Sequence, residues 1–82
     1  MKNNILRAVS DETRLSMLAH LSKCELCACM LPKMLKKSQP AVSQHLSVLN
    51  SAGLVSFRRD GAKRLYSLTA KGRRVLSDVS KW

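Results

Sequence analysis

The segment from Ser38 to Leu49 constrains the fold of this chain most, because it reads as one amphipathic helix with two unlike faces. Ser38 is a favourable N-cap, and Pro40 falls in the first turn, where its missing N–H costs nothing. One face repeats apolar residues at i, i+4 and i+7: Val42, Leu46 and Leu49. The opposite face carries short uncharged side chains, Ser43, Gln44 and Ser47. These groups can donate hydrogen bonds to, and accept them from, base edges in a DNA major groove, which is typical of a recognition helix. A core helix with a small polar surface would show the same pattern. The flanking segments decide between the two interpretations.

The charge of the chain points to a polyanionic partner. Its 82 residues predict a single domain over residues 1–82, short enough to gain stability from oligomerisation. Fifteen Lys and Arg against five Asp and Glu give a formal charge of +10, which favours nucleic acid first and an anionic membrane second. The longest apolar run, 26–31, falls far short of the roughly 20 residues of a membrane span. The N-terminus has no signal-peptide core, so we expect a cytoplasmic protein.

Periodicity predicts three helices before the central segment. Residues 2–9 form a short candidate with an apolar side of Ile5, Leu6 and Val9. Asp11 is expected to cap a second helix that repeats Leu15, Leu18 and Leu21. A third is expected from about Cys27 to Lys37, with Leu31, Met34 and Leu35 as its buried side. Because Pro32 is tolerated only in a first turn, either the regular helix starts near Leu31 or its first turn is distorted.

The central helix, predicted over 38–52, ends at Gly53, and a hairpin follows. Two extended segments, 54–59 and 62–68, flank the turn Asp60-Gly61, which is a strong hairpin signal. A final helix is predicted over 69–81. The order helix, helix, helix–short turn–helix, hairpin, helix is that of a winged helix-turn-helix, a mainly α fold with a β-hairpin wing (α+β).

In such a fold the second paired helix enters the major groove and the wing reaches phosphates or the minor groove. Seven of the fifteen cationic residues lie between Arg58 and Arg74, where Asp60 is the sole acidic residue. We therefore interpret this run as phosphate-binding rather than as a solvated surface. His45 either donates to a phosphate or packs at the edge of the helix pair. Arg14 either forms an ion pair within the domain or contacts the DNA backbone. The predicted DNA-binding residues are Gln39, Ser43, Gln44, His45, Ser47, Arg58, Arg59, Lys63 and Arg64.

Four stretches together resemble one family, the ArsR/SmtB metal-responsive repressors. They are D-E-T-R-L at 11–15, E-L-C-A-C at 25–29, S-Q-P-A-V-S-Q-H-L at 38–46 and the hairpin segment 61–68. The resemblance covers nearly the whole chain, and its E-L-C-x-C stretch is similar to the thiol-based sensors of the family. It implies a homodimeric transcriptional repressor that binds a palindromic operator in double-stranded DNA and releases it when an inducer ion binds.

Three cysteines, Cys24, Cys27 and Cys29, crowd into six residues and are candidate metal ligands. Three thiolates suit trivalent arsenic or antimony, whose lone pair takes the remaining direction, whereas Zn(II) and Cd(II) prefer four ligands. His20 is a candidate fourth ligand. The alternative interpretation is that these cysteines are small apolar side chains buried in the core. Three cysteines within six residues favour a role as metal ligands or redox groups instead.

The chain departs from the family pattern at two places. Arsenic-sensing members commonly carry a third thiol three residues after the C-x-C, where this chain has Pro32; Cys24 lies on the other side instead. The zinc-responsive pattern on the last helix is missing, since 69–82 holds no His or Glu and only Asp78.

Geometry suggests how an ion could act. Cys27 and Cys29, two residues apart, point to different sides of a regular helix, so gripping one ion requires a non-helical first turn. That segment leads into the helix before the recognition helix, and a distortion there would shift the two recognition helices of a dimer. A rival functional interpretation is a redox-sensing repressor that forms a Cys24–Cys27 disulfide.

The terminal helices are the predicted dimer interface. Their apolar stripes have few partners within their own domain, and a two-fold interface would bury them. Its residues are Ile5, Leu6, Val9, Val75, Val79 and Trp82. An alternative of another class is a small basic RNA-binding protein with a structural zinc, but Phe57, Tyr66 and Trp82 form no stacking platform in sequence. An enzyme is not expected, because neither a carboxylate pair nor a nucleophile with a base is evident.

Overall fold

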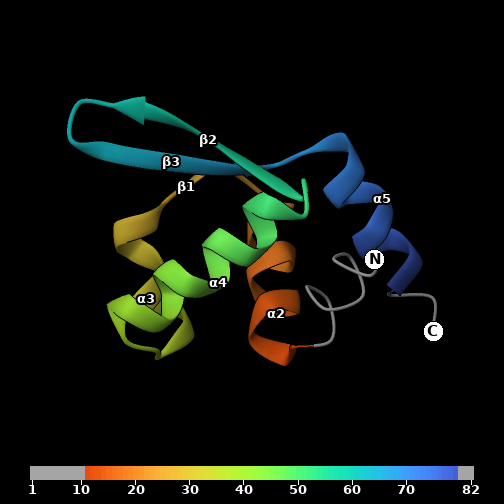
Figure 1. Ribbon diagram of the computed structural model, residues 1–82, viewed down its shortest axis with the longest axis horizontal. Coiled ribbons are helices and arrows are strands. Elements are labelled where there is room, and N and C mark those ends of the chain that lie inside the picture. The colour runs from red at the N-terminus through yellow and green to blue at the C-terminus, as the bar shows by residue number, and fades with distance from the viewer. Residues whose placement is uncertain (1–10, 80–82) are drawn as a thin grey trace.

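The structure is a computed structural model that describes residues 11–79 of the chain. The predicted helix at 2–9 and the terminal residues 80–82 lie outside this range. The described elements follow the order α2, β1, a 3₁₀ turn, α3, α4, β2, β3 and α5. Figure 1 shows the helices gathered into one body, from which the β2–β3 hairpin extends as a long arm. This arrangement confirms the predicted winged helix.

Helix α2, Glu12–Leu21, begins where the sequence predicts. The Asp11 carboxylate accepts hydrogen bonds from the backbone N–H groups of Thr13 at 2.8 Å and Arg14 at 3.2 Å. Burial of the carboxyl raises its pKa. The two N–H donors and the charges of His45 and Arg14 outweigh that effect and hold the pKa of Asp11 below its ordinary value.

The segment between α2 and α4 is less helical than its periodicity suggests. Strand β1, Leu26–Cys27, is followed by a 3₁₀ turn, Ala28–Met30, and only then by α3, Leu31–Leu35. The regular helix therefore starts at Leu31 with Pro32 in its first turn, one of the two outcomes expected. The prediction that Met34 is buried was wrong. It is 40% exposed, because α3 is a short helix that packs Leu31 and Leu35 against the core and ends at Leu35, followed by Lys36 in the left-handed conformation.

Helix α4, Gln39–Ser51, is the predicted central helix. The Ser38 hydroxyl accepts the N–H of Ala41 at 3.3 Å and caps it. Its apolar stripe is buried as expected, and it joins α2 and the sheet in one hydrophobic core: Met17, Leu18, Leu21, Leu26, Leu31, Val42, Leu46, Leu49, Ala52, Leu54, Val55, Tyr66 and Leu68.

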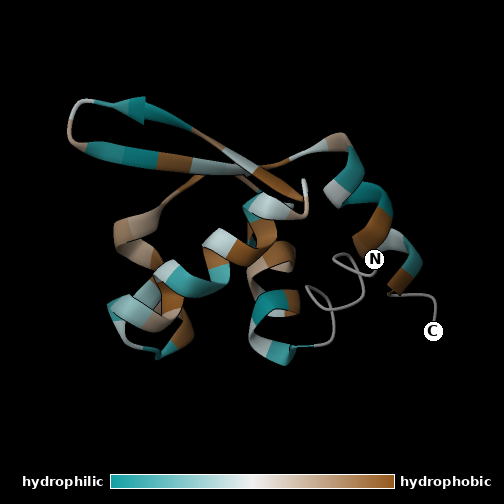
Figure 2. Ribbon diagram, viewed as in Figure 1, coloured by the Kyte–Doolittle hydropathy of each residue, from teal (hydrophilic) through white to brown (hydrophobic). Residues whose placement is uncertain are grey.

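The hairpin consists of β2, Val55–Asp60, and β3, Lys63–Leu68, which pair antiparallel from Val55↔Leu68 to Asp60↔Lys63. We call this hairpin the wing. Gly61 takes φ +65° in its turn, a conformation that side chains disfavour. Strand β1, which the sequence did not reveal, adds a third strand in the order β1-β3-β2. Figure 2 shows the distal part of the wing as hydrophilic and its base as hydrophobic.

Helix α5, Ala70–Val79, packs back onto the body. The hydroxyl of Thr69 accepts the N–H of Gly72 at 2.9 Å and donates to the carbonyl of Gly53 at 2.7 Å, so one side chain ties the start of α5 to the end of α4. Within residues 11–79 no helix has the length and apolar character needed to cross a membrane.

Candidate nucleic-acid interface

Helix α4 presents an uncharged polar face to solvent. Because its apolar stripe is buried in the core, the remaining sides of the helix are turned outward. The predicted base-reading residues are all exposed on it: Gln39, Ser43, Gln44 and Ser47. Asn50, which the sequence pattern had not singled out, is exposed as well. Its spacing of three residues from Ser47 on the same stripe was the signal that could have found it.

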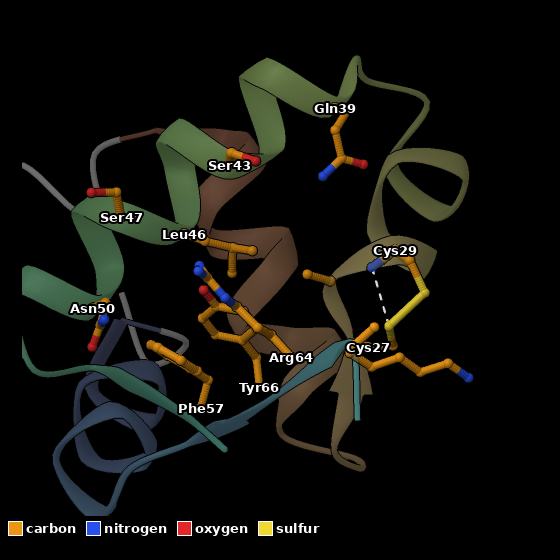
Figure 3. A pocket seen from close by; sticks show the side chains of 13 residues that line it. Cys27, Cys29, Gln39, Ser43, Leu46, Ser47, Asn50, Phe57, Arg64 and Tyr66 are labelled. Atoms are coloured by element: carbon orange, nitrogen blue, oxygen red, sulfur yellow. Dashed lines mark hydrogen bonds between the residues drawn. A yellow bond between two sulfur atoms is a disulfide. The ribbon is translucent and has the colours of Figure 1, made fainter. Parts of the chain in front are cut away.

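A cleft of about 440 Å³ lies between α4, the wing and the segment that follows β1. Figure 3 shows Gln39, Ser43, Ser47 and Asn50 along one wall and Phe57, Arg64 and Tyr66 on another. Three of the four predicted base-reading residues, Gln39, Ser43 and Ser47, thus share one concave surface with the wing, whereas Gln44 is exposed but does not line the cleft. A cavity lined by neutral donors on one side and cations on the other is suited to a nucleic-acid strand, whose bases and phosphates need those two kinds of partner.

The four predicted wing cations are exposed but are held differently. The guanidinium carbon of Arg64 lies 5.2 Å from the centre of the Phe57 ring, which itself packs 5.1 Å from the Tyr66 ring. This cation–π contact directs Arg64 along the cleft. Lys63 also lines the cleft, whereas Arg58 and Arg59 do not.

Arg58 is engaged by a carboxylate instead. Its Nε and one terminal nitrogen each donate to a carboxylate oxygen of Glu25 at 2.9 Å. This hydrogen bonding and the negative charge of Glu25 raise the pKa of Arg58 above its usual value. The guanidinium that was predicted to bind phosphate therefore already has an anionic partner in the absence of DNA.

The other predicted contacts are only partly exposed. His45 is half-buried, and its charge is felt by Asp11 at the start of α2. Arg14 lies 3.6 Å from the same carboxylate and its side chain is 17% exposed, which favours the intradomain ion pair over a backbone contact with DNA.

The cysteines border the cleft. Cys27 ends β1 and Cys29 lies in the 3₁₀ turn, and their sulfur atoms are joined as a disulfide (Figure 3). The N–H of Cys29 also donates to the Cys27 sulfur at 3.3 Å. The non-helical backbone that two sulfurs at this spacing require is thus present, and it brings them together.

Cys24 stands apart from this pair, free and exposed. Over residues 11–79 no three or more His, Cys, Asp or Glu side chains are grouped closely enough to hold a metal ion, so neither Cys24 nor His20 is assembled with the other two. The disulfide suggested between Cys24 and Cys27 is replaced by Cys27–Cys29. The physical reason is that pairing of β1 with β3 keeps Cys27 extended. The 3₁₀ turn at Ala28–Met30 then brings the sulfur of Cys29 back beside that of Cys27.

The predicted dimer interface is only partly visible. Val75 and Val79 are half-buried against the core of their own domain. The remaining predicted interface residues lie outside the described range: Ile5, Leu6, Val9 and Trp82.

Comparisons with known proteins agree with this geometry. Residues 11–56 match the family model described as bacterial regulatory protein, arsR family. The chain is 40% identical over 77 residues to the arsenical resistance operon repressor of Staphylococcus aureus, covering 94% of this chain and 71% of that protein. It is 42% identical over 66 residues to the protein of the same name from Staphylococcus xylosus, covering 80% and 64%. The chain therefore spans roughly two thirds of the length of these relatives.

Among solved structures, NolR from Sinorhizobium fredii superimposes with a TM-score of 0.85 at 35% sequence identity, covering 95% of this chain and 79% of that one. A likeness of that extent includes the wing as well as the paired helices. The arrangement of α4, the wing and the core is therefore the same in the two structures.

Proposed function

The chain belongs to the ArsR family of bacterial regulatory proteins, and from this premise we propose that it is a homodimeric repressor released from its operator by trivalent arsenic or antimony. The family makes it a DNA-binding transcriptional regulator and not an enzyme. The observation that carries the inducer proposal is the adjacency of the Cys27 and Cys29 sulfurs beside the DNA-facing cleft.

Operator binding would follow the geometry of the cleft. Helix α4 enters the major groove, where Gln39, Ser43, Gln44 and Ser47 meet base edges. Arg59, Lys63 and Arg64 extend along the wing toward phosphates, and His45 donates to a phosphate near the start of α2. The exposure of the first set and the charge of the second support these roles.

The inducer site consists of Cys24, Cys27 and Cys29 in their thiolate forms. The Cys27–Cys29 disulfide must first take up two electrons and two protons from a cellular thiol, because only free thiols can ligate the ion. Arsenous acid then exchanges three As–OH bonds for three As–S bonds, and each departing hydroxide takes the proton of one thiol and leaves as water. Cys24 reaches the other two if the exposed loop between α2 and β1 refolds. With Cd(II) or Zn(II) a fourth ligand would be needed, for which His20 is the nearest candidate in sequence.

Release of DNA follows from the position of this site in the chain. The cysteines immediately precede α3, and α3 is joined to α4 by the short turn at 36–38. A coordinated ion that redirects residues 24–30 would move α3 and α4 together. In a homodimer the two recognition helices must stay about 34 Å apart to match one duplex turn, so a small rotation weakens both half-site contacts. By linkage, the ion then binds less tightly to the DNA-bound protein.

The Cys27–Cys29 disulfide also favours a second candidate function, a redox-sensing repressor. Closing and opening that bond would change the same turn without any ion. The RNA-binding alternative with a structural zinc gains no support, because the described residues hold no four-ligand group and the chain belongs to a family of DNA-binding regulators.

One titration separates these candidates. Labelled DNA from upstream of the gene is bound by the fully reduced protein, and fluorescence anisotropy is followed as arsenite is added. Arsenic sensing predicts release at one ion per protomer, lost in Cys27→Ser and Cys29→Ser and weakened in Cys24→Ser. Redox sensing predicts no response to arsenite and release by peroxide, reversed by dithiothreitol. Tight DNA binding that neither reagent changes would contradict both.

A further inference from the structure

The cysteine segment is physically part of the wing sheet. Strand β1 pairs with β3 through Leu26↔Tyr66 and Cys27↔Leu65, which makes it the outer strand beside the wing. Cys27 thus has its backbone paired to β3 and is also one of the residues that line the cleft. A change at the sulfur that moves this backbone must therefore act on the strand that carries Lys63 and Arg64.

A second connection reaches the other wing strand. Glu25, directly before β1, holds Arg58 of β2 through two hydrogen bonds of 2.9 Å, a bidentate pair between residues 33 positions apart. Arg58 is opposite Leu65, which is also the partner of Cys27. The ion pair therefore spans the sheet from β1 to β2 across β3. A planar bidentate pair fixes orientation as well as distance, which a single-point contact does not.

We propose that Glu25 is a positioning residue that couples the cysteine site to the wing. It braces the wing for phosphate contact while the cysteines are unliganded, and inducer binding at Cys27 and Cys29 withdraws Glu25 from Arg58. The signal reaches DNA through the wing in addition to the path through α3 and α4. This inference rests on the proposed inducer function.

The small size of β1 and the exposure of the ion pair support this coupling. A strand of two residues contributes only two ladder positions, and the Glu25–Arg58 pair adds a side-chain connection to β2 that this ladder does not make. The pair is exposed, with Arg58 63% and Glu25 33% accessible, so it can break without exposing buried charge. We therefore expect removal of the pair to change DNA binding several-fold rather than to unfold the domain.

The test compares two neutralising variants in the full chain. Glu25→Gln breaks the brace, whereas Glu12→Gln, at the exposed start of α2, changes the net charge equally and leaves the wing alone. For each protein the operator Kd is measured with and without saturating arsenite. Arsenic binding is measured separately, without DNA, from the near-ultraviolet absorbance of As–S bonds.

Glu25→Gln is expected to bind the operator at least three-fold more weakly than Glu12→Gln. Its arsenite response, the ratio of the two Kd values, should fall at least five-fold below that of the wild type while arsenic binding stays within two-fold. The charge-swapped double variant Glu25→Arg with Arg58→Glu should regain most of the response. Glu12→Gln should respond as the wild type does.

Salt dependence supplies a readout that a merely structural role would not move. If arsenite loosens the wing, the slope of log K against log salt becomes shallower by about 0.9 for each phosphate that the wing no longer neutralises. Glu25→Gln frees Arg58 but also removes the brace, and we expect the loss of wing contacts to dominate, so the slope should be shallower with and without arsenite. A steeper slope would mean that the freed Arg58 binds a phosphate of its own, and would overturn the proposal. An unchanged arsenite response in Glu25→Gln would overturn this proposal while leaving the inducer function intact. A wild type that ignores arsenite would overturn the proposed function, and this inference with it.

Discussion

The α-carbon of Gly72 in α5 faces the backbone carbonyl of Leu54 so closely that a methyl group on Gly72 would overlap it. Leu54 is fully buried, and its carbonyl also accepts the N–H of Thr69 at 3.1 Å. Neither group can retreat without breaking that hydrogen bond or opening the core. This close approach fixes α5 against the base of the wing.

Gly72→Ala is therefore expected to destabilise the domain. Alanine favours helix by about 1 kcal/mol over glycine, but overpacking against a fixed backbone costs about 1–3 kcal/mol, so the net change is a loss. Urea unfolding at one protein concentration measures it, with exposed Arg74→Ala as the control in the same helix. A midpoint for Gly72→Ala at or above the wild-type value would show that α5 does not pack this closely.

The Asp11 cap should make stability depend on acid pH. The folded pKa of Asp11 is lowered, so its contribution is present above the unfolded value of about 4 and is lost as pH falls through the folded pKa. Asp11→Ala should cost about 1 kcal/mol near pH 7. Asp11→Asn keeps a capping oxygen and should cost less. Thermal unfolding between pH 2 and 7 checks this: the difference between wild type and Asp11→Asn must shrink below pH 4.

Short-range sequence signals predicted most of the fold. Ser38 and Gly53 act within a few residues of themselves and mark the limits of α4 correctly. The turn predicted at Asp60-Gly61 was one residue too early, because Asp60 still pairs with Lys63 and the chain turns at Gly61-Ala62. Burial of the α4 stripe followed from its periodicity alone. These features could be predicted because the interactions that cause them are close in sequence.

The missed features depend on partners far along the chain. Strand β1 exists because Leu26 and Cys27 meet Tyr66 and Leu65, and nothing within the apolar run 26–31 indicates that pairing. The adjacency of the two sulfurs follows from β1. The partner of Arg58 was equally hidden, since charge patterning suggests phosphate binding and cannot show a carboxylate 33 residues away.

Gln39 is expected to read a base. It stands at the first position of α4, exposed and lining the cleft, where recognition helices usually make their base contacts. Gln39→Ala should lose about 1–3 kcal/mol of discrimination, roughly 5- to 150-fold, against one base-pair change in each half-site. Competition binding with single-substituted operators measures it. Ser51→Ala, exposed on the same helix but outside the cleft, should leave the preference unchanged. Equal losses on every DNA sequence would instead indicate a phosphate contact.

The wing cations should differ in their contribution to salt-dependent binding. Lys63 and Arg64 line the cleft, and within residues 11–79 neither forms an ion pair with a carboxylate, so each alanine substitution should weaken binding alike on all sequences and reduce the salt slope by about 0.9. Arg58 already donates two hydrogen bonds to the Glu25 carboxylate. Substituting Arg58 by alanine therefore removes a positive charge that Glu25 has already partly neutralised. Arg58→Ala should therefore change the slope by clearly less than Arg64→Ala. Anisotropy titrations from 50 to about 300 mM salt measure all three slopes. Equal slope changes for Arg58 and Arg64 would mean that DNA displaces Glu25, and that the ion pair seen in the free protein opens on binding.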